Sequence, residues 1–177
     1  SDELPWVLGW KATLLDYNGE IEKADQLLDT GRDNFGEEPD FLFLEAAILV
    51  RRQLTPEAMD VIERLLEICP THRGALRLRA DLSFGNQSTE EALADLQAML
   101  ELDYADAAVA VELTSAFYRA RRYREALDVC LGWSDRDQVL PPQMAVYVVL
   151  SHAGLAELEE ALEKLPDIPS DLLIAAI

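Results

Sequence analysis

The sequence repeats itself every 34 residues, and small side chains carry the repeat. Two series share this period, one made of Ala24, Ala58, Ala92 and Ala126 and the other of Ala12, Ala46, Ala80 and Thr114. A period of this length is typical of a pair of amphipathic helices that stacks on its neighbours. The small residues mark where helices approach most closely, because larger side chains would push the paired helices apart. We therefore expect an all-α chain built from repeated helix pairs.

The expected helix ends agree with a 34-residue unit of two helices. Gly19 and Gly85-Asn86 fall between the two helices of their units, where a turn is required. Thr55 followed by Pro56 favours the start of a helix. No stretch alternates with a period of two, so strands are not expected. The predicted helices span residues 4–17, 20–31, 39–52, 56–68, 73–84, 89–101, 105–119, 122–132, 142–153, 155–164 and 170–177.

Residues at fixed places in each unit resemble the consensus of the tetratricopeptide repeat family from about residue 5 to 140. The first unit contributes Leu8, Ala12, Leu15, Gly19, Ala24, Leu28 and Gly31, and the second Leu42, Ala46, Leu49, Ala58, Ile62 and Pro70. The third contributes Leu76, Ala80, Ala92 and Leu96, and the fourth Phe117, Tyr123 and Ala126. Tyr104 replaces the usual proline, and Trp133 stands where a small residue is expected. Packing is therefore expected to change after the fourth unit.

The resemblance implies a right-handed α-solenoid of antiparallel helix pairs, with about four to five repeats in a single domain, 1–177. A fifth unit fits only if it is shifted by one residue, which gives Ala161 the alanine place. The implied repeats span about 5–38, 39–72, 73–106, 107–140 and a degenerate 141–165, with an extra C-terminal helix at 170–177.

The resemblance also implies a partner-binding groove, because the first helix of each unit lines the concave face in this family. The predicted groove residues are Trp6, Tyr17, Phe43, Arg51, Arg77, Asp81, Phe84, Tyr118 and Arg119, together with Thr13, Ala47, Val50, Val111 and Ser115. Aromatic and arginine side chains dominate binding hot spots. The alternative for Phe43, Val50 and Phe84 is packing between repeats. We expect Tyr118→Ala or Arg77→Ala to weaken partner capture without lowering the melting temperature; early unfolding would instead indicate packing residues.

The groove positions bear on two more specific kinds of binding. Some family members clamp the terminal carboxylate of a chaperone tail with groove lysines and asparagines. Here the asparagine places hold Thr13, Ala47, Asp81 and Ser115, and no groove lysine is seen, so this function is not expected. An arginine cluster, made of Arg119, Arg121, Arg122 and Arg124, suits an acidic partner through bidentate pairs. The alternative is local pairing with Glu125 or Asp128.

The net charge of the chain argues against two classes of binding partner. The chain has 34 acidic against 15 basic residues and a net charge of -19. Such a chain repels phosphates, so neither nucleic acid nor an anionic membrane is expected as a direct partner. No apolar run reaches the length of a membrane span, so no membrane insertion is expected in this segment. Cytoplasmic and periplasmic locations both stay open.

The sequence contains no arrangement typical of a catalytic or metal site. His72 and His152 lie far apart, and Cys69 and Cys130 have no metal-ligand spacing. The run of glutamates at 157–163 is expected to be a solvated helix surface with ordinary pKa values. We expect no enzyme activity and no cofactor.

The leading hypothesis is a non-enzymatic adaptor or assembly scaffold that binds protein segments. By family analogy, it would belong to a bacterial envelope, secretion or exopolysaccharide export system. The alternative is the regulatory or substrate-recruiting segment of a larger enzyme. The apolar end of the sequence suggests a fragment of a longer protein, and self-association through Leu172, Leu173 and Ile177 is a third possibility.

Overall fold

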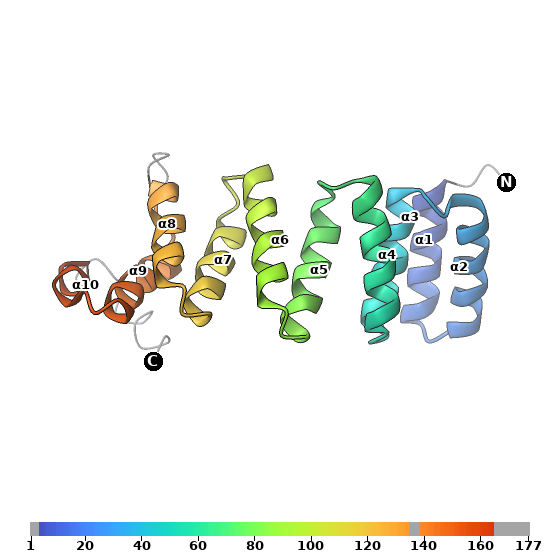
Figure 1. Cartoon of the computed structure of the whole chain (residues 1–177). Helices are drawn as coiled ribbons and strands as arrows, with labels where there is room; N and C mark the ends of the chain where they lie inside the picture. The colour runs from blue at the N-terminus through green and yellow to red at the C-terminus, as the bar shows by residue number, and fades with distance from the viewer. Residues whose placement is uncertain (1–3, 135–138, 165–177) are drawn as a thin grey trace. The chain divides into compact units, whose positions relative to one another are not determined.

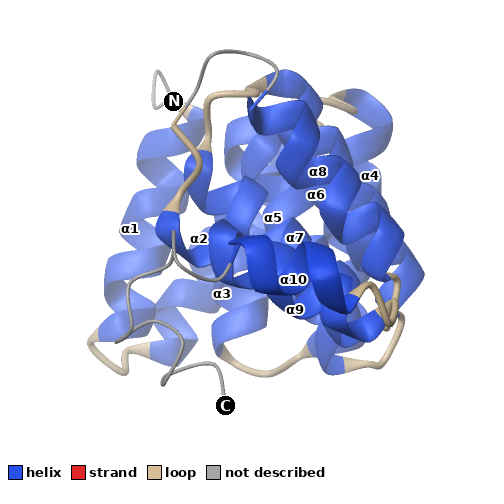
Figure 2. Ribbon diagram, turned by 90° about the vertical axis from the view of Figure 1, so that its left-hand side faces the viewer, coloured by secondary structure: helices blue, strands red, loops and turns tan. Residues whose placement is uncertain are grey.

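The computed structural model describes residues 4–134 and 139–164 (Figure 1). Within these ranges every regular element is a helix (Figure 2). The first helices are α1 (Pro5–Tyr17), α2 (Ile21–Phe35), α3 (Pro39–Arg51), α4 (Thr55–Ile68) and α5 (Arg73–Gly85). They are followed by α6 (Thr89–Leu102), α7 (Ala107–Arg119), α8 (Tyr123–Ser134), α9 (Pro142–Gly154) and α10 (Leu158–Lys164). The helix predicted for 170–177 lies outside the described residues.

The chain divides between Ser88 and Thr89 into two compact units, called unit 1 and unit 2. In unit 1, α1 packs on α2, α3 packs on α4, and neighbouring pairs meet through α1 and α3. In unit 2, α7 packs on α8 and α9 packs on α10. Successive first helices begin at Pro5, Pro39, Arg73 and Ala107, which preserves the 34-residue period. Helix α9 begins one residue later than this period, at Pro142.

The small-residue series occupies the centre of the helix contacts. All the alanines of both series are fully buried, and Thr114 is buried in the place of the eighth. Thr114 fits because its hydroxyl donates a hydrogen bond to the Ala110 carbonyl at 2.8 Å, so no polar group is left unpaired. The close-approach role predicted for these positions is confirmed.

One tight turn recurs within each helix pair. At every such turn one residue has a positive φ: Gly19, Gln53, Gln87, Arg121 and Ala156. The next residue donates its backbone N–H to a carbonyl five residues earlier, as in Glu20 to Leu15 and Glu157 to His152. This is the pattern of a Schellman cap, which satisfies the last carbonyls of the first helix. The turn after α9 also explains why α10 begins at Leu158 and not near 155 as predicted.

Helix α2 is longer than the sequence predicted. We expected it to end at Gly31, but it continues to Phe35. Gly31 lies inside the helix, and its missing side chain leaves room for the ring of Phe41. Phe35 packs on the core cluster of unit 1, which consists of Leu8, Ala12, Leu28, Phe41 and Ile48.

The core of unit 2 contains the residue that departs from the repeat pattern. Trp133 is buried and packs with Ala110, Cys130 and Met144. Its indole N–H donates to the Val139 carbonyl at 3.1 Å, which pairs the one polar atom of the side chain. Ala161 is also buried, against Val146 and Val149 of α9.

Candidate functional site

The predicted groove residues of unit 1 lie on α1, α3 and α5. We call the set Trp6, Tyr17, Phe43, Arg51, Arg77, Asp81 and Phe84 the first-helix face. Trp6 is 48% and Tyr17 70% exposed. Arg51 and Asp81 are also exposed, whereas Phe43, Arg77 and Phe84 are half-buried. Of the remaining predicted groove residues of this unit, Thr13 donates its hydroxyl to the Gly9 carbonyl at 2.9 Å.

Tyr17 and Arg51 form the most developed contact on this face. The guanidinium of Arg51 lies 4.5 Å above the centre of the Tyr17 ring. Arg51 also forms an ion pair with Asp16, whose side chain is enclosed. Arg52 donates its Nε to the same carboxylate at 2.6 Å and its Nη1 to Asp25 at 2.7 Å. An enclosed anion therefore holds both arginines, and Arg51 is fixed against an exposed aromatic ring.

A second pair of groove residues meets on α5. Arg77 and Asp81 lie one helical turn apart, with Nε and Oδ1 separated by 3.5 Å. Both side chains are about half exposed, so the pair contributes little to stability. It places charges of both signs on the first-helix face.

Phe43 has a clear packing role. Its ring lies against Gly74, where an added Cβ would come within 2.6 Å of the ring. The centroid of the His72 ring is 5.1 Å away. These contacts join α3 to the beginning of α5 and agree with the alternative that Phe43 packs between repeats.

In unit 2 the predicted groove residue Tyr118 is part of an aromatic cluster. Its ring centroid lies 5.5 Å from those of both Tyr123 and Tyr147. The Tyr147 hydroxyl donates to the Ser115 hydroxyl at 3.0 Å. The cluster connects α7, α8 and α9, so Tyr118 has packing partners on two other helices. Arg119 is exposed at the end of α7.

Two arginines of the cluster, Arg122 and Arg124, form ion pairs within unit 2. The Arg122 guanidinium bonds Glu125 at 2.8 Å and Glu90 at 2.7 Å and lies over the Phe117 ring. The hydrogen bond from Arg122 lowers the pKa of Glu125. Arg124 bonds Glu157 at 3.1 Å. The local pairing of Arg122 with Glu125, one of the two alternatives for this cluster, is present.

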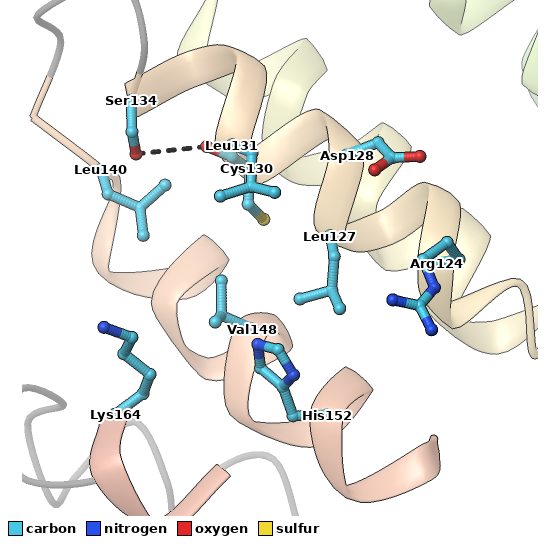
Figure 3. A pocket seen from close by; sticks show the side chains of 10 residues that line it. All are labelled: Arg124, Leu127, Asp128, Cys130, Leu131, Ser134, Leu140, Val148, His152 and Lys164. Carbon is cyan, nitrogen blue, oxygen red and sulfur yellow. Dashed lines mark hydrogen bonds between the residues drawn. The ribbon is translucent and has the colours of Figure 1, made fainter. Parts of the chain in front are cut away.

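Unit 2 also contains a largely apolar pocket of about 410 Å³ (Figure 3). Helices α8, α9 and α10 and the segment before α9 supply its lining, which includes Leu127, Cys130, Leu131, Leu140 and Val148, with His152 and Lys164 near its edge. Burial raises the pKa of the Cys130 thiol to about 11. A thiol with this pKa is protonated at neutral pH and is a poor nucleophile.

The two histidines have structural partners. His72 accepts a hydrogen bond from the Ala75 N–H at 3.1 Å and so caps α5. His152 lies 2.8 Å from Glu157, and this hydrogen bond is the main cause of the lowered pKa of Glu157. Among residues 4–134 and 139–164, no group of three or more histidines, cysteines and acids is placed to hold a metal ion. In the same ranges no helix has the length and apolar character needed to cross a membrane.

The sequence interpretation missed Trp10, Leu14 and Tyr147. Trp10 and Leu14 are 52% and 60% exposed on α1. Trp6, Trp10 and Leu14 follow one another at intervals of four residues. This spacing was a usable signal, because residues four apart share one side of a helix. Tyr147 was missed because it belongs to the unit whose register shifts by one residue.

Comparison with known proteins agrees with this architecture. A sequence profile of the tetratricopeptide repeat family matches residues 11–73. The match covers about the first two of the repeats. The matched segment covers the Tyr17–Arg51 contact and both pairs of alanines that belong to the first two repeats. No curated protein sequence matches the chain.

Solved structures share this fold over nearly the whole chain. A MamA RS-1 double mutant is 16% identical, with a TM-score of 0.71 and coverage of 99% of this chain and 98% of that one. YrrB, described as a tetratricopeptide repeat protein with an unusual peptide-binding site, is 19% identical, with a TM-score of 0.64 and coverage of 93% and 87%. PilF of Pseudomonas aeruginosa is 13% identical, with a TM-score of 0.63 and coverage of 89% and 71%. At these identities the likeness concerns the fold, and the predicted α-solenoid class is confirmed.

Proposed function

We propose that this chain is a non-enzymatic interaction module that binds an extended segment of a partner protein on the first-helix face of unit 1. The observation that carries the proposal is the Tyr17–Arg51 contact. Tyr17 is 70% exposed, yet its ring is fixed by a guanidinium that an enclosed carboxylate holds in place. Ordering an aromatic side chain before binding reduces the entropy that the complex must lose.

Neighbouring groups support a peptide as the ligand. Trp6 adds a second exposed aromatic ring on α1, and the Arg77–Asp81 pair adds charges of both signs on α5. Aromatic rings bury large areas, while arginine and carboxylate side chains can bond peptide groups. YrrB, which shares the fold, has a peptide-binding site, and this is consistent with the same use of the fold here.

A displayed library of random peptides tests the proposal with the full chain as bait. We expect enriched peptides whose affinity falls at least about tenfold in Tyr17→Ala, the loss expected of a hot-spot residue. Tyr104→Ala, which truncates an exposed tyrosine of unit 2, is the matched control and is expected to bind normally. Equal binding of enriched peptides to Tyr17→Ala and to the unaltered chain would contradict the proposal, as would a library without enrichment.

We propose in addition that the module works in a bacterial envelope, secretion or exopolysaccharide export system. The likeness to PilF of Pseudomonas aeruginosa supports a bacterial setting. The sequence of the full-length protein tests this part. A signal peptide together with an outer-membrane barrel would support it, whereas a transferase or kinase domain would favour the regulatory segment of an enzyme.

A further inference from the structure

The apolar pocket of unit 2 shares no residue with the first-helix face (Figure 3). Its volume of about 410 Å³ lies within the range of about 300–1,000 Å³ that small-molecule sites occupy. The lining residues of α8 run from Arg124 to Ser134, which are about 15 Å apart along the helix axis. A helix with its side chains is about 10–12 Å in diameter and would not fit inside. The pocket therefore has the size of a site for an elongated small molecule.

The 34-residue period explains why space opens beside α8. Two residues of the pocket wall, Cys130 and Ser134, are smaller than their equivalents in other second helices. The place of Cys130 holds Leu28, Ile62 and Leu96 in α2, α4 and α6. The place of Ser134 holds Leu66 in α4 and Leu100 in α6. Replacing large apolar side chains by small ones leaves a cavity where the surroundings do not collapse.

Leu131 departs from the repeat in the opposite sense. It lines the pocket and is 61% exposed. The equivalent residues of the other second helices are polar and exposed, namely Asp29, Glu63 and Gln97. Single exposed leucines are common on protein surfaces. This one extends the apolar wall of the pocket to its edge, so the same helix that loses bulk inside the pocket gains an apolar side chain at the opening.

The polar atoms of the pocket wall have partners within the chain. The Ser134 hydroxyl donates to the Cys130 carbonyl at 3.2 Å (Figure 3). The Cys130 thiol donates to the Met144 carbonyl at 3.8 Å. Leu127 and Val148 contribute aliphatic side chains. The wall therefore needs no hydrogen bond from a ligand, and it favours an aliphatic one.

The charged groups at the edge of the pocket are paired with one another. Arg124 and His152 both contact the Glu157 carboxylate, at 3.1 and 2.8 Å. The Lys164 Nζ atom lies 3.8 Å from the Glu163 carboxylate. A charged ligand would have to break one of these pairs or place its charge against apolar side chains, where a charge without a partner is costly. The edge thus favours an uncharged ligand.

We infer that the pocket between α8 and α9 binds an uncharged, elongated aliphatic molecule. The molecule lies along α8, in the space that Cys130 and Ser134 leave open, and Leu131 covers part of it at the edge. Apolar cavities of about 150 Å³ already bind benzene, so a pocket of about 410 Å³ accommodates a longer chain. The inference goes beyond the proposed peptide site and does not depend on it.

Titration of the full chain with octanol, octanoate and octylamine tests the inference. The three probes share one aliphatic chain and differ in the charge of the head group. We expect octanol to shift the methyl NMR signals of Leu127 and Val148, and to bind at least about tenfold more tightly than either charged probe. Octanoate is disfavoured further, because Asp128 adds a carboxylate to the pocket lining.

Two variants locate the binding site. Ser134→Leu restores the residue of α4 and α6, fills part of the pocket and should lower the affinity for octanol at least about tenfold. Leu131→Gln copies the residue of α6 and should weaken binding severalfold. Because Leu131 is exposed, the melting temperature should not change, so this variant keeps the test decisive if Ser134→Leu is less stable. Leu102→Gln, at an exposed leucine of α6, is the matched control and should bind octanol normally.

Any of the following results would overturn the inference. Octanol could leave the pocket methyl signals unchanged, or bind Ser134→Leu and Leu131→Gln as tightly as the unaltered chain. Octylamine or octanoate could bind more tightly than octanol. Nuclear Overhauser contacts between the pocket methyl groups and residues 165–177 of the free chain would make that segment the occupant. Tyr17→Ala should bind octanol normally whether or not it binds peptides, so this test and the peptide test fail independently.

Discussion

The ring of Phe41 fills the space beside Gly31 on the neighbouring helix, where any β-carbon would stand. Phe41 is fully buried and cannot swing into solvent. We therefore expect Gly31→Ala to destabilise the protein by about 1–3 kcal/mol through overpacking, despite the better helix propensity of alanine. Urea denaturation measures the change in the free energy of unfolding.

Gly85→Ala is the matched control, because nothing lies within 4 Å of the added Cβ. It should be neutral or slightly stabilising. Adding Phe41→Leu to Gly31→Ala should recover part of the loss, since the two side chains compete for one space. A Gly31→Ala protein as stable as the unaltered chain would show that the ring can move aside.

The recurring turn predicts a substitution that stabilises the protein. Gln87 has a φ of 64° in the Schellman cap after α5. A residue with a β-carbon loses roughly 1–2 kcal/mol in this region, and glycine does not. Glycine also loses more backbone entropy on folding than other residues do. With this loss included, we expect Gln87→Gly to stabilise the protein by about 0.5–1 kcal/mol. Thermal denaturation should show a higher melting temperature, whereas Gln97→Gly within α6 should lower it.

Tyr118 should behave as a packing residue. Because its ring contacts those of Tyr123 and Tyr147, we expect Tyr118→Ala to cost about 1–3 kcal/mol. This replaces the expectation from the sequence that the variant melts normally. Tyr17→Ala, which removes an exposed ring, should cost less than about 1 kcal/mol. Equal melting temperatures for the two variants would show that the tyrosine cluster adds no stability.

The Arg122–Glu125 pair predicts that the stability of the protein depends on pH. The hydrogen bond from Arg122 lowers the pKa of Glu125 from its ordinary value of 4.5 in the folded chain. The pair therefore adds stability above pH 4.5, and this contribution is lost as the pH falls through the lowered pKa. Denaturation at several pH values should show that Glu125→Gln has a lower free energy of unfolding than the unaltered chain at neutral pH. This difference should disappear in acid. The unaltered chain, measured at the same pH values, is the reference.

The repeat and the helices were predictable because their causes are local. The buried alanines and the periodic helix starts follow directly from residue spacing. The end of α2 was not predictable, because a glycine near a helix end usually signals a cap, whereas Gly31 accommodates a ring from another helix. No local pattern reports such a contact between Gly31 and Phe41.

Residue spacing and the family resemblance select the residues of the candidate site but not their contacts. Family resemblance placed Tyr17 and Arg51 together, and the structure adds that Asp16 holds Arg51 from behind. The partner of Tyr118 could not be foreseen, because Tyr147 lies in a unit whose register shifts by one residue. A shift of this size leaves the helix intact and moves a different side chain to each position.

The two arginines on Asp16 also bear on which ligands the proposed peptide site would accept. A phosphorylated or strongly acidic segment competes with Asp16 for the guanidinium of Arg51. Drawing Arg51 away would leave an enclosed carboxylate with one cation fewer, and loss of a partner from a buried ion pair is costly. At the proposed peptide site, Arg51 would therefore favour ligands that touch its exposed edge without removing it, and would disfavour the anions that arginine usually attracts.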